Sequence, residues 1–409
     1  MGSEMCIRDS HVARGTAHAA AWLVSPTLGS HTGISTPLKH QPRRSTRQLS
    51  PPSWNNWSAT TWRPRSSALW RSRLGRTALE YGHSMATLRD KGWAYFDAIV
   101  AAAPLRDDNP WVHRGDRTAY EPDYDTLERL LGVPVLLKAT SQSGVPALAL
   151  DVWVAYEFRR AGFDADRVWP RASTPRVLPS EIKDFVEKLP KKDRPALWQR
   201  IERGVGGLSS ANLLGKNYVK QVDVVMSRWA TGPELMVSTK RMDSSFGKNA
   251  ANRVEESYGD AKNLRLRHPQ AALGFFYSLS ALALETEADT AEWLIDLLIK
   301  LGREDDAYDA VALVLPDLTK SQEPADPEPQ EEAGPIEAGA QEDVALVEVE
   351  AGEPTIDLDD VVPVSLYREA VPNELDPGRF FAVMIARILD NSPINFHTEA
   401  RAKRRSPTT

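Results

Sequence analysis

The stretch QVDVVMSRWATGPELMVSTK (residues 221–240) decides the fold class of this chain. Two apolar runs, 221–226 and 234–240, flank the tripeptide Thr-Gly-Pro at 231–233. Glycine and proline between two apolar runs indicate a turn, because glycine tolerates unusual backbone angles and proline fixes its own. The stretch therefore predicts two consecutive strands joined by a tight connection.

Polar side chains in these two strands are candidates for chemistry. Asp223 lies in the first strand, and Lys240 ends the second. Because strand side chains alternate between faces with period two, Ser238 and Lys240 share a face. Glu234 has the same parity, but it lies about 20 Å from Lys240 along an extended strand. The spacing therefore excludes Glu234 from a metal site shared with Lys240 unless the chain bends.

The next element supplies two further carboxylates. We expect a helix from Lys248 to about Leu264, with Glu255 and Glu256 on its polar side. Carboxylates hold a divalent metal ion that activates water for phosphodiester cleavage, and a lysine stabilises the charge that develops on the phosphate. Each residue alone is more often structural or simply solvated. Their joint arrangement leads us to expect the missing carboxylate from Glu255 or Glu256.

The order of elements predicted from residue 221 onward is strand–strand–helix–strand–helix–strand–helix, which indicates an α/β fold with a mixed sheet flanked by helices. We expect an N-terminal helical region over 85–145 and a main domain over 146–400, interrupted by a disordered acidic insertion at 320–342. The individual predictions are helices at 86–103, 124–131, 146–161, 181–189, 194–202, 288–301 and 377–389, strands at 133–138, 271–284 (or helix) and 344–350, and a polar loop at 104–122.

Composition restricts the class of protein only loosely. The chain has 409 residues, a hydrophobic fraction of 42% and a net charge of −6, which allows a sizeable core. The charge is uneven, since residues 320–353 are strongly acidic, so the total does not decide whether the partner is a nucleic acid. The single cysteine, Cys6, excludes an internal disulfide and a cysteine-based zinc site. This usage agrees with a cytoplasmic location.

Residues 1–84 do not resemble the rest of the chain. They lack apolar periodicity and carry eleven Lys and Arg residues. Their first ten residues, MGSEMCIRDS, resemble translated sequencing-adapter sequence. We therefore expect 1–84 to be non-native sequence, with translation starting near Met85; the alternative is a genuine basic, disordered arm. A peptide from residues 20–70 in natively expressed protein would contradict the first interpretation.

The pattern resembles the PD-(D/E)xK nucleases, and within them the type II restriction endonucleases that carry Ser-x-Lys on the strand and a glutamate on the following helix. Asp223 matches the first acidic position, with Val222 in place of the usual proline, and Ser238-Thr-Lys240 matches Ser-x-Lys. Glu255 is fifteen residues past Lys240, one more than that subset implies, so Glu256 stays open. The resemblance covers roughly residues 146–395.

What the resemblance implies is a Mg²⁺-dependent endonuclease that cleaves double-stranded DNA. Asp223 and Glu255 would bind the metal, Lys240 would stabilise charge or orient water, and Ser238 would support them. The subset also has a glutamate on an early helix, for which Glu157 is the candidate. Cutting both strands of a short site calls for a two-fold assembly, so a homodimer is expected. A restriction enzyme also implies a cognate DNA methyltransferase encoded nearby.

Basic residues gather around these positions in the sequence and are candidates for DNA contacts. The alternative is ordinary solvated helix charge. The glycine-rich stretch 204–220 is a further candidate, and it is not a phosphate-binding Walker A loop because Ser210 replaces the required glycine. The candidates are Arg241, Lys248, Arg253, Lys262, Lys216 and Asn217, with Arg265, Arg267 and His268 nearby.

Two rival functions remain open from the sequence. The first is a repair, recombination or modification-dependent nuclease of the same fold, which the absence of a neighbouring methyltransferase gene would favour. The second is a non-enzymatic DNA-binding protein whose acidic residues are structural. Incubation of supercoiled plasmid with Mg²⁺ or with EDTA separates the second from the nucleases. The sequence does not define the recognition site or the cleavage position.

Overall fold

A computed structural model describes residues 87–103, 108–202, 211–244, 246–318 and 356–408, without the side chains of residues 248 and 249. The predictions for residues 1–84, for the acidic insertion and for the strand at 344–350 lie outside these residues. No helix in the described ranges is both long and apolar enough to cross a membrane.

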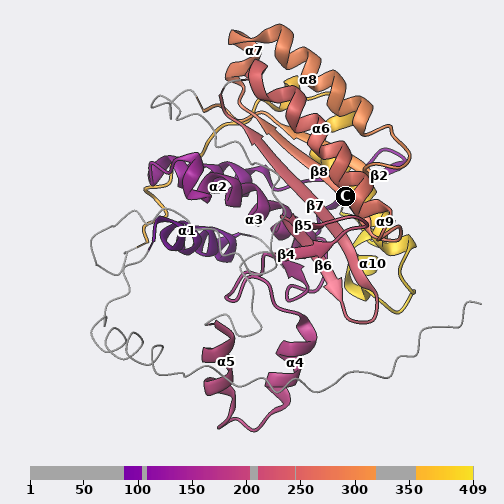
Figure 1. The fold of residues 1–409 in the computed structure, drawn as a ribbon. Helices are drawn as coiled ribbons and strands as arrows, with labels where there is room; N and C mark the ends of the chain where they lie inside the picture. Colours follow the sequence, from indigo (N-terminus) through magenta and orange to yellow (C-terminus); the bar gives the residue numbers. More distant parts are fainter. Residues whose placement is uncertain (1–86, 104–107, 203–210, 245, 319–355, 409) are drawn as a thin grey trace, which may run out of the picture. The chain divides into compact units, whose positions relative to one another are not determined.

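A five-stranded mixed sheet forms the centre of the described chain (Figure 1). Its strand order is β3-β6-β7-β8-β9. The pairs β3–β6 and β6–β7 are antiparallel, whereas β7–β8 and β8–β9 are parallel. The bounds are β3 Val168–Trp169, β6 Val224–Arg228, β7 Gly232–Met242, β8 Ala272–Leu279 and β9 Ala310–Val314. The predicted mixed sheet flanked by helices is thereby confirmed, as are the two consecutive strands around residue 231.

Alternation along the strands separates two hydrophobic cores, one on each face of the sheet. In β7, Leu235 and Val237 face the first core, whereas Met236 and Met242 face the second. The first core also contains residues of α1 (Leu88–Ala102), α2 (Tyr124–Leu136), α3 (Val145–Arg160) and α9 (Pro377–Asp390). The second contains residues of α6 (Phe246–Arg265), α7 (Leu282–Thr286) and α8 (Ala288–Leu301). The N-terminal helices therefore share a core with the sheet.

Smaller elements complete the described chain. Two hairpins lie outside the five-stranded sheet: β1–β2, and β4–β5, which directly precedes β6. Their bounds, with those of the remaining helices, are β1 Trp111–Arg114, β2 Arg117–Tyr120, β4 Ala211–Leu214, β5 Val219–Val222, η1 Ser141–Ser143, α4 Ser180–Lys188, α5 Arg194–Glu202, η3 Arg368–Ala370, η4 Asn373–Leu375 and α10 Thr398–Arg405.

The predicted strand at 133–138 is wrong, because α2 continues through this segment to Leu136. Its valines favour a strand locally, but Leu130, Leu131 and Val133 are all buried in the first core. Gly132 allows the close packing, since a Cβ atom there would lie 2.2 Å from the carbonyl oxygen of Val362. Burial therefore outweighs the β-propensity of the run.

Two other segments also differ from the predictions. The polar loop at 104–122 contains the β1–β2 hairpin, whose turn places Gly115 at a φ of +61°. Such a left-handed conformation suits glycine, which lacks a Cβ atom. The segment 271–284 is a strand only to Leu279, after which α7 begins at Leu282.

Candidate functional site

The candidate site lies where β6 and β7 separate. The last residue pair that joins these strands at this end is Val224 with Val237, whereas β7 continues beside β8 to Met242. Asp223 immediately precedes β6, and its Oδ2 accepts the backbone N–H of Thr239 at 2.8 Å. A charge-assisted hydrogen bond of this kind holds the Asp223 carboxylate at the fork where β6 and β7 separate.

Thr239 also holds a second carboxylate, that of Asp151 on α3. The Thr239 hydroxyl donates to Asp151 Oδ1 at 2.6 Å, while its backbone N–H binds Asp223. Burial, and next the negative charge of Asp223, raise the pKa of Asp151 well above its usual value, and the nearby Lys240 opposes this shift. A buried carboxylate and a half-buried one that repel each other favour binding of a proton or a cation between them.

Ser238 and Lys240 lie on the other face of β7 from Thr239, as strand parity predicts. Ser238 is 3% exposed, and its hydroxyl has no hydrogen-bond partner within the described residues. Lys240 is half-buried. A buried hydroxyl without a partner is costly, so Ser238 is a group that a ligand or water at this fork would satisfy. Asp223 is thus bound to the backbone of Thr239, the residue between Ser238 and Lys240.

The two adjacent glutamates of α6 differ in exposure. Glu255 is exposed. Glu256 is half-buried, its carboxylate lies 3.7 Å from the Arg253 guanidinium, and its Oε2 atom is buried without a hydrogen bond within the described residues. The negative charge of Glu256 also acts on Tyr218, just before β5. Of the two, Glu256 therefore lies on the side of α6 that faces the strands leading to Asp223, and Glu255 on the solvent side.

The packed side of α6 carries Ala250, Val254 and Ala261, with Tyr258 partly buried against the same core. It also includes three buried polar side chains: Ser257, Asp260 and Asn263. Sequence periodicity missed them because polar residues count as solvent-facing in any search for an apolar stripe.

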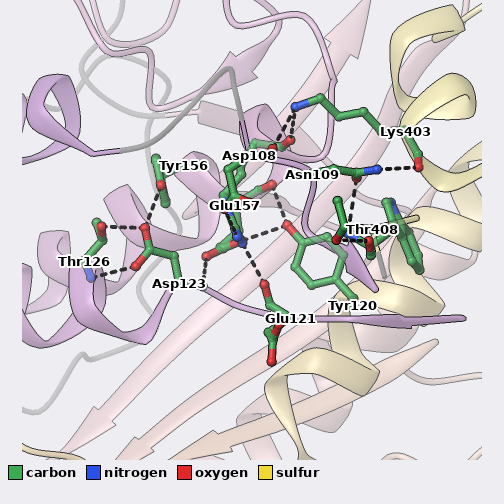
Figure 2. A network of polar contacts seen from close by, with 12 residues as sticks. Asp108, Asn109, Tyr120, Glu121, Asp123, Thr126, Tyr156, Glu157, Lys403 and Thr408 are labelled. Atoms are coloured by element: carbon green, nitrogen blue, oxygen red, sulfur yellow. Dashed lines mark hydrogen bonds and ion pairs between the residues drawn. The ribbon is translucent and has the colours of Figure 1, made fainter. Parts of the chain in front are cut away.

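Glu157 belongs to a different network from the one around Asp223 (Figure 2). Its Oε1 accepts the backbone N–H of Asp123 at 2.7 Å, and its Oε2 accepts the hydroxyl of Tyr120 at 2.7 Å and Nη1 of Arg160 at 3.2 Å. These bonds tie α3 to the start of α2 and to β2. Glu157 therefore joins elements of the fold, and the α3 carboxylate that lies near Asp223 is Asp151.

Helix geometry explains why Asp151 and Glu157 lie in different surroundings. Asp151 and Glu157 are six residues apart on α3, which separates them by about 9 Å along the axis and roughly 240° around it. Only one of them can face the fork in the sheet. The sequence does not show which, because every residue of α3 except Ala147 is buried.

We expect the stability contribution of Glu157 to depend on pH. Burial raises its pKa from an ordinary 4.5 to about 7, so the folded protein binds a proton more tightly than the unfolded chain does. The contribution is therefore fully present below pH 4.5 and is lost as pH rises through about 7. Denaturant unfolding from pH 5 to 8 should show wild-type stability falling by up to roughly 3 kcal/mol relative to Glu157→Gln. Parallel curves for the two proteins would contradict this.

Most of the predicted DNA-binding cations have intramolecular partners. Arg241 donates to the Pro146 carbonyl at 2.6 Å and pairs with Asp243, and Lys262 pairs with Asp306. Arg253 lies near Glu256. Lys216 and Asn217 are exposed between β4 and β5. The side chain of Lys248 lies outside the described residues.

Comparisons with known proteins give no further identification, since no protein-family model, curated protein or solved structure matches the chain. Within the part of the chain that the structure describes, no group of three or more His, Cys, Asp or Glu side chains is arranged to hold a metal ion. The site is thus defined by two carboxylates around Thr239, a buried hydroxyl and a lysine.

Proposed function

We propose that this protein is a Mg²⁺-dependent endonuclease that cleaves double-stranded DNA, in the manner of a type II restriction endonuclease. The observation that carries the proposal is that a single residue of β7, Thr239, binds both Asp223 and Asp151. Lys240 is the next residue of the same strand. Paired carboxylates beside a lysine are the groups required for hydrolysis of a phosphodiester with a bound metal.

The residues present fit a magnesium ion. Mg²⁺ is usually held by one or two carboxylates, with water and substrate phosphate completing its octahedral shell. Asp223 and Asp151 supply two carboxylates, both bound to Thr239. When bound, the ion activates water and neutralises charge on the phosphate. Of the two glutamates, Glu256 lies nearer than the expected Glu255 to the strands that lead to Asp223, but α6 packs on the sheet face opposite α3 and Asp151.

The remaining roles belong to the chain itself. Asp223 and Asp151 hold the cation, and their shared bonds to Thr239 set the separation between them. Lys240, whose positive charge already acts on Asp151, lies where it can stabilise charge on the phosphate or orient the attacking water. Cleavage of both strands is expected to need two copies of the chain, so the proposal includes a homodimer.

The decisive experiment uses the purified full chain and supercoiled plasmid with Mg²⁺ or with EDTA. Nicked and linear products that require Mg²⁺ would support the proposal. Sequencing the ends of cleaved genomic DNA then gives the recognition site. Absence of cleavage across unmodified and methylated DNA of many sequences would refute it. Cleavage of methylated DNA alone would instead support a modification-dependent nuclease.

We expect Asp151→Asn to reduce cleavage by about a hundredfold or more, because it removes one charge from a two-carboxylate site. The amide oxygen still accepts the Thr239 hydroxyl, so the fold is retained. The matched control is Glu157→Gln on the same helix, which should cut at the normal rate at neutral pH. Plasmid cleavage rates of both variants give the test. The opposite order of effects would show that Glu157, and not Asp151, is the second carboxylate required for cleavage.

A further inference from the structure

The connection between β4 and β5 is held by one buried side chain of α6, that of Asn263. Asn263 is 1% exposed. Its Oδ1 accepts the backbone N–H of Asn217 at 2.8 Å and of Tyr218 at 3.3 Å, and its Nδ2 donates to the Tyr218 carbonyl at 3.1 Å. The backbone carbonyl of Asn263 accepts the backbone N–H of Lys216 at 2.8 Å. Three successive residues of the turn are therefore fixed to a single helix position.

Gly215 makes this contact possible. A Cβ atom at Gly215 would lie 2.2 Å from Nδ2 of Asn263, a distance that real atoms do not adopt. The turn therefore packs against α6 at Gly215, which has no side chain. Glycine at such a position indicates a close approach of the backbone to another group rather than chain flexibility.

The same hairpin leads directly into the candidate site. Its second strand, β5, ends at Val222, next to Asp223. Two further contacts attach it to α6, from the Tyr218 hydroxyl to Asp260 at 3.1 Å and from the Lys220 ammonium to Asp260 at 2.8 Å. The turn and β5 are therefore both attached to α6, and β5 continues directly into Asp223.

The turn presents an uncompensated positive charge to solvent. Lys216 and Asn217 are exposed, and Lys216 forms no ion pair with any residue that the structure describes. Two other lysines of this region differ, because Lys220 pairs with Asp260 and Lys262 with Asp306. An exposed lysine beside an amide donor, on a backbone that cannot move freely, suits a phosphate oxygen of a nucleic acid.

We propose that Lys216 and Asn217 form a contact for the DNA backbone at the turn of the β4–β5 hairpin, and that Asn263 is the positioning residue that holds them there. This inference rests on the proposed function, and it identifies where the duplex is bound relative to Asp223. The turn sets the position of the DNA, while the carboxylates and Lys240 act on the phosphate.

The test measures binding of a fluorescent DNA duplex to the full chain in EDTA, over a series of salt concentrations, so that cleavage plays no part. We expect Lys216→Ala to weaken binding severalfold and to reduce the slope of log affinity against log salt by about one. The matched control is Lys192→Ala, an exposed lysine between α4 and α5, which should leave the slope unchanged. Wild-type affinity and slope for Lys216→Ala would overturn the proposal.

A second set of variants separates positioning from general stability. Asn263→Ala should weaken binding, and adding Lys216→Ala to it should cost much less than in the wild type, because Lys216 has already lost its position. Gly215→Ala should weaken binding as well, but should add little in the Asn263→Ala background, where the colliding atoms are gone. Fully additive losses in both double variants would overturn the role of Asn263.

The results also separate this inference from the proposed function. A wild-type protein that binds duplex through Lys216 but never cuts would refute the nuclease and leave the contact supported. A protein that cuts normally and binds equally well without Lys216 would refute the contact alone. A wild-type protein with no affinity for duplex DNA would refute both.

Discussion

Asp223→Asn is expected to lower the rate of DNA cleavage by on the order of a thousandfold, the largest effect of any single substitution in this chain. On the proposed function Asp223 holds the metal, and the loss of such a carboxylate removes several kcal/mol of stabilisation from the transition state. Asparagine has the same shape, and its side-chain oxygen still accepts the backbone N–H of Thr239, which Asp223 accepts at 2.8 Å. The fork between β6 and β7 should therefore keep its geometry.

Single-turnover cleavage of plasmid over a range of Mg²⁺ concentrations is the appropriate measurement. If Asp223 binds the cation, the variant should need more Mg²⁺ as well as cutting more slowly. Asp296→Asn, which removes an exposed carboxylate on α8 paired with Lys300, provides a control that should behave as wild type. A variant that cuts at the normal rate would exclude Asp223 from the site.

The part of this site that the sequence predicts is the part encoded locally. Ser238 and Lys240 share a face because alternation along a strand is fixed by backbone geometry alone. Asp223 lies opposite them because two strands joined by a short turn pair in antiparallel register. These relations need no knowledge of the rest of the fold, which is why the central hairpin and its polar residues could be placed from the sequence.

The contributions of the helices could not be predicted in the same way. In α3, burial on all sides removes the amphipathic pattern, so Asp151 and Glu157 cannot be distinguished by periodicity. In α6, polar residues such as Asn263 are buried beside the apolar stripe, and a search for apolar periodicity does not find them. Which residue of a helix faces the sheet depends on packing partners far away in the chain, and those partners are defined only by the tertiary structure.

Lys240→Ala is expected to reduce cleavage by about a hundredfold to a thousandfold, the range for removing one preorganised charge-stabilising group, while leaving DNA affinity nearly unchanged. The reason is position: Lys240 is half-buried in β7, close enough for its charge to act on Asp151. Its charge is therefore directed at the fork rather than at the outer DNA backbone. Lys240→Met, which keeps the length of the side chain without its charge, should show the same loss.

Lys216 and Lys240 are expected to affect different measurements. If the two lysines have the roles argued above, Lys216→Ala should weaken binding in EDTA and leave the cleavage rate of saturated enzyme largely intact, whereas Lys240→Ala should do the reverse. The two measurements together distinguish an ammonium group that stabilises charge during the reaction from one that only attracts the phosphate backbone. The contrary result is an equal loss of affinity in both variants, with cleavage by Lys240→Ala restored at saturating protein. That result would show that Lys240 contributes to DNA binding only.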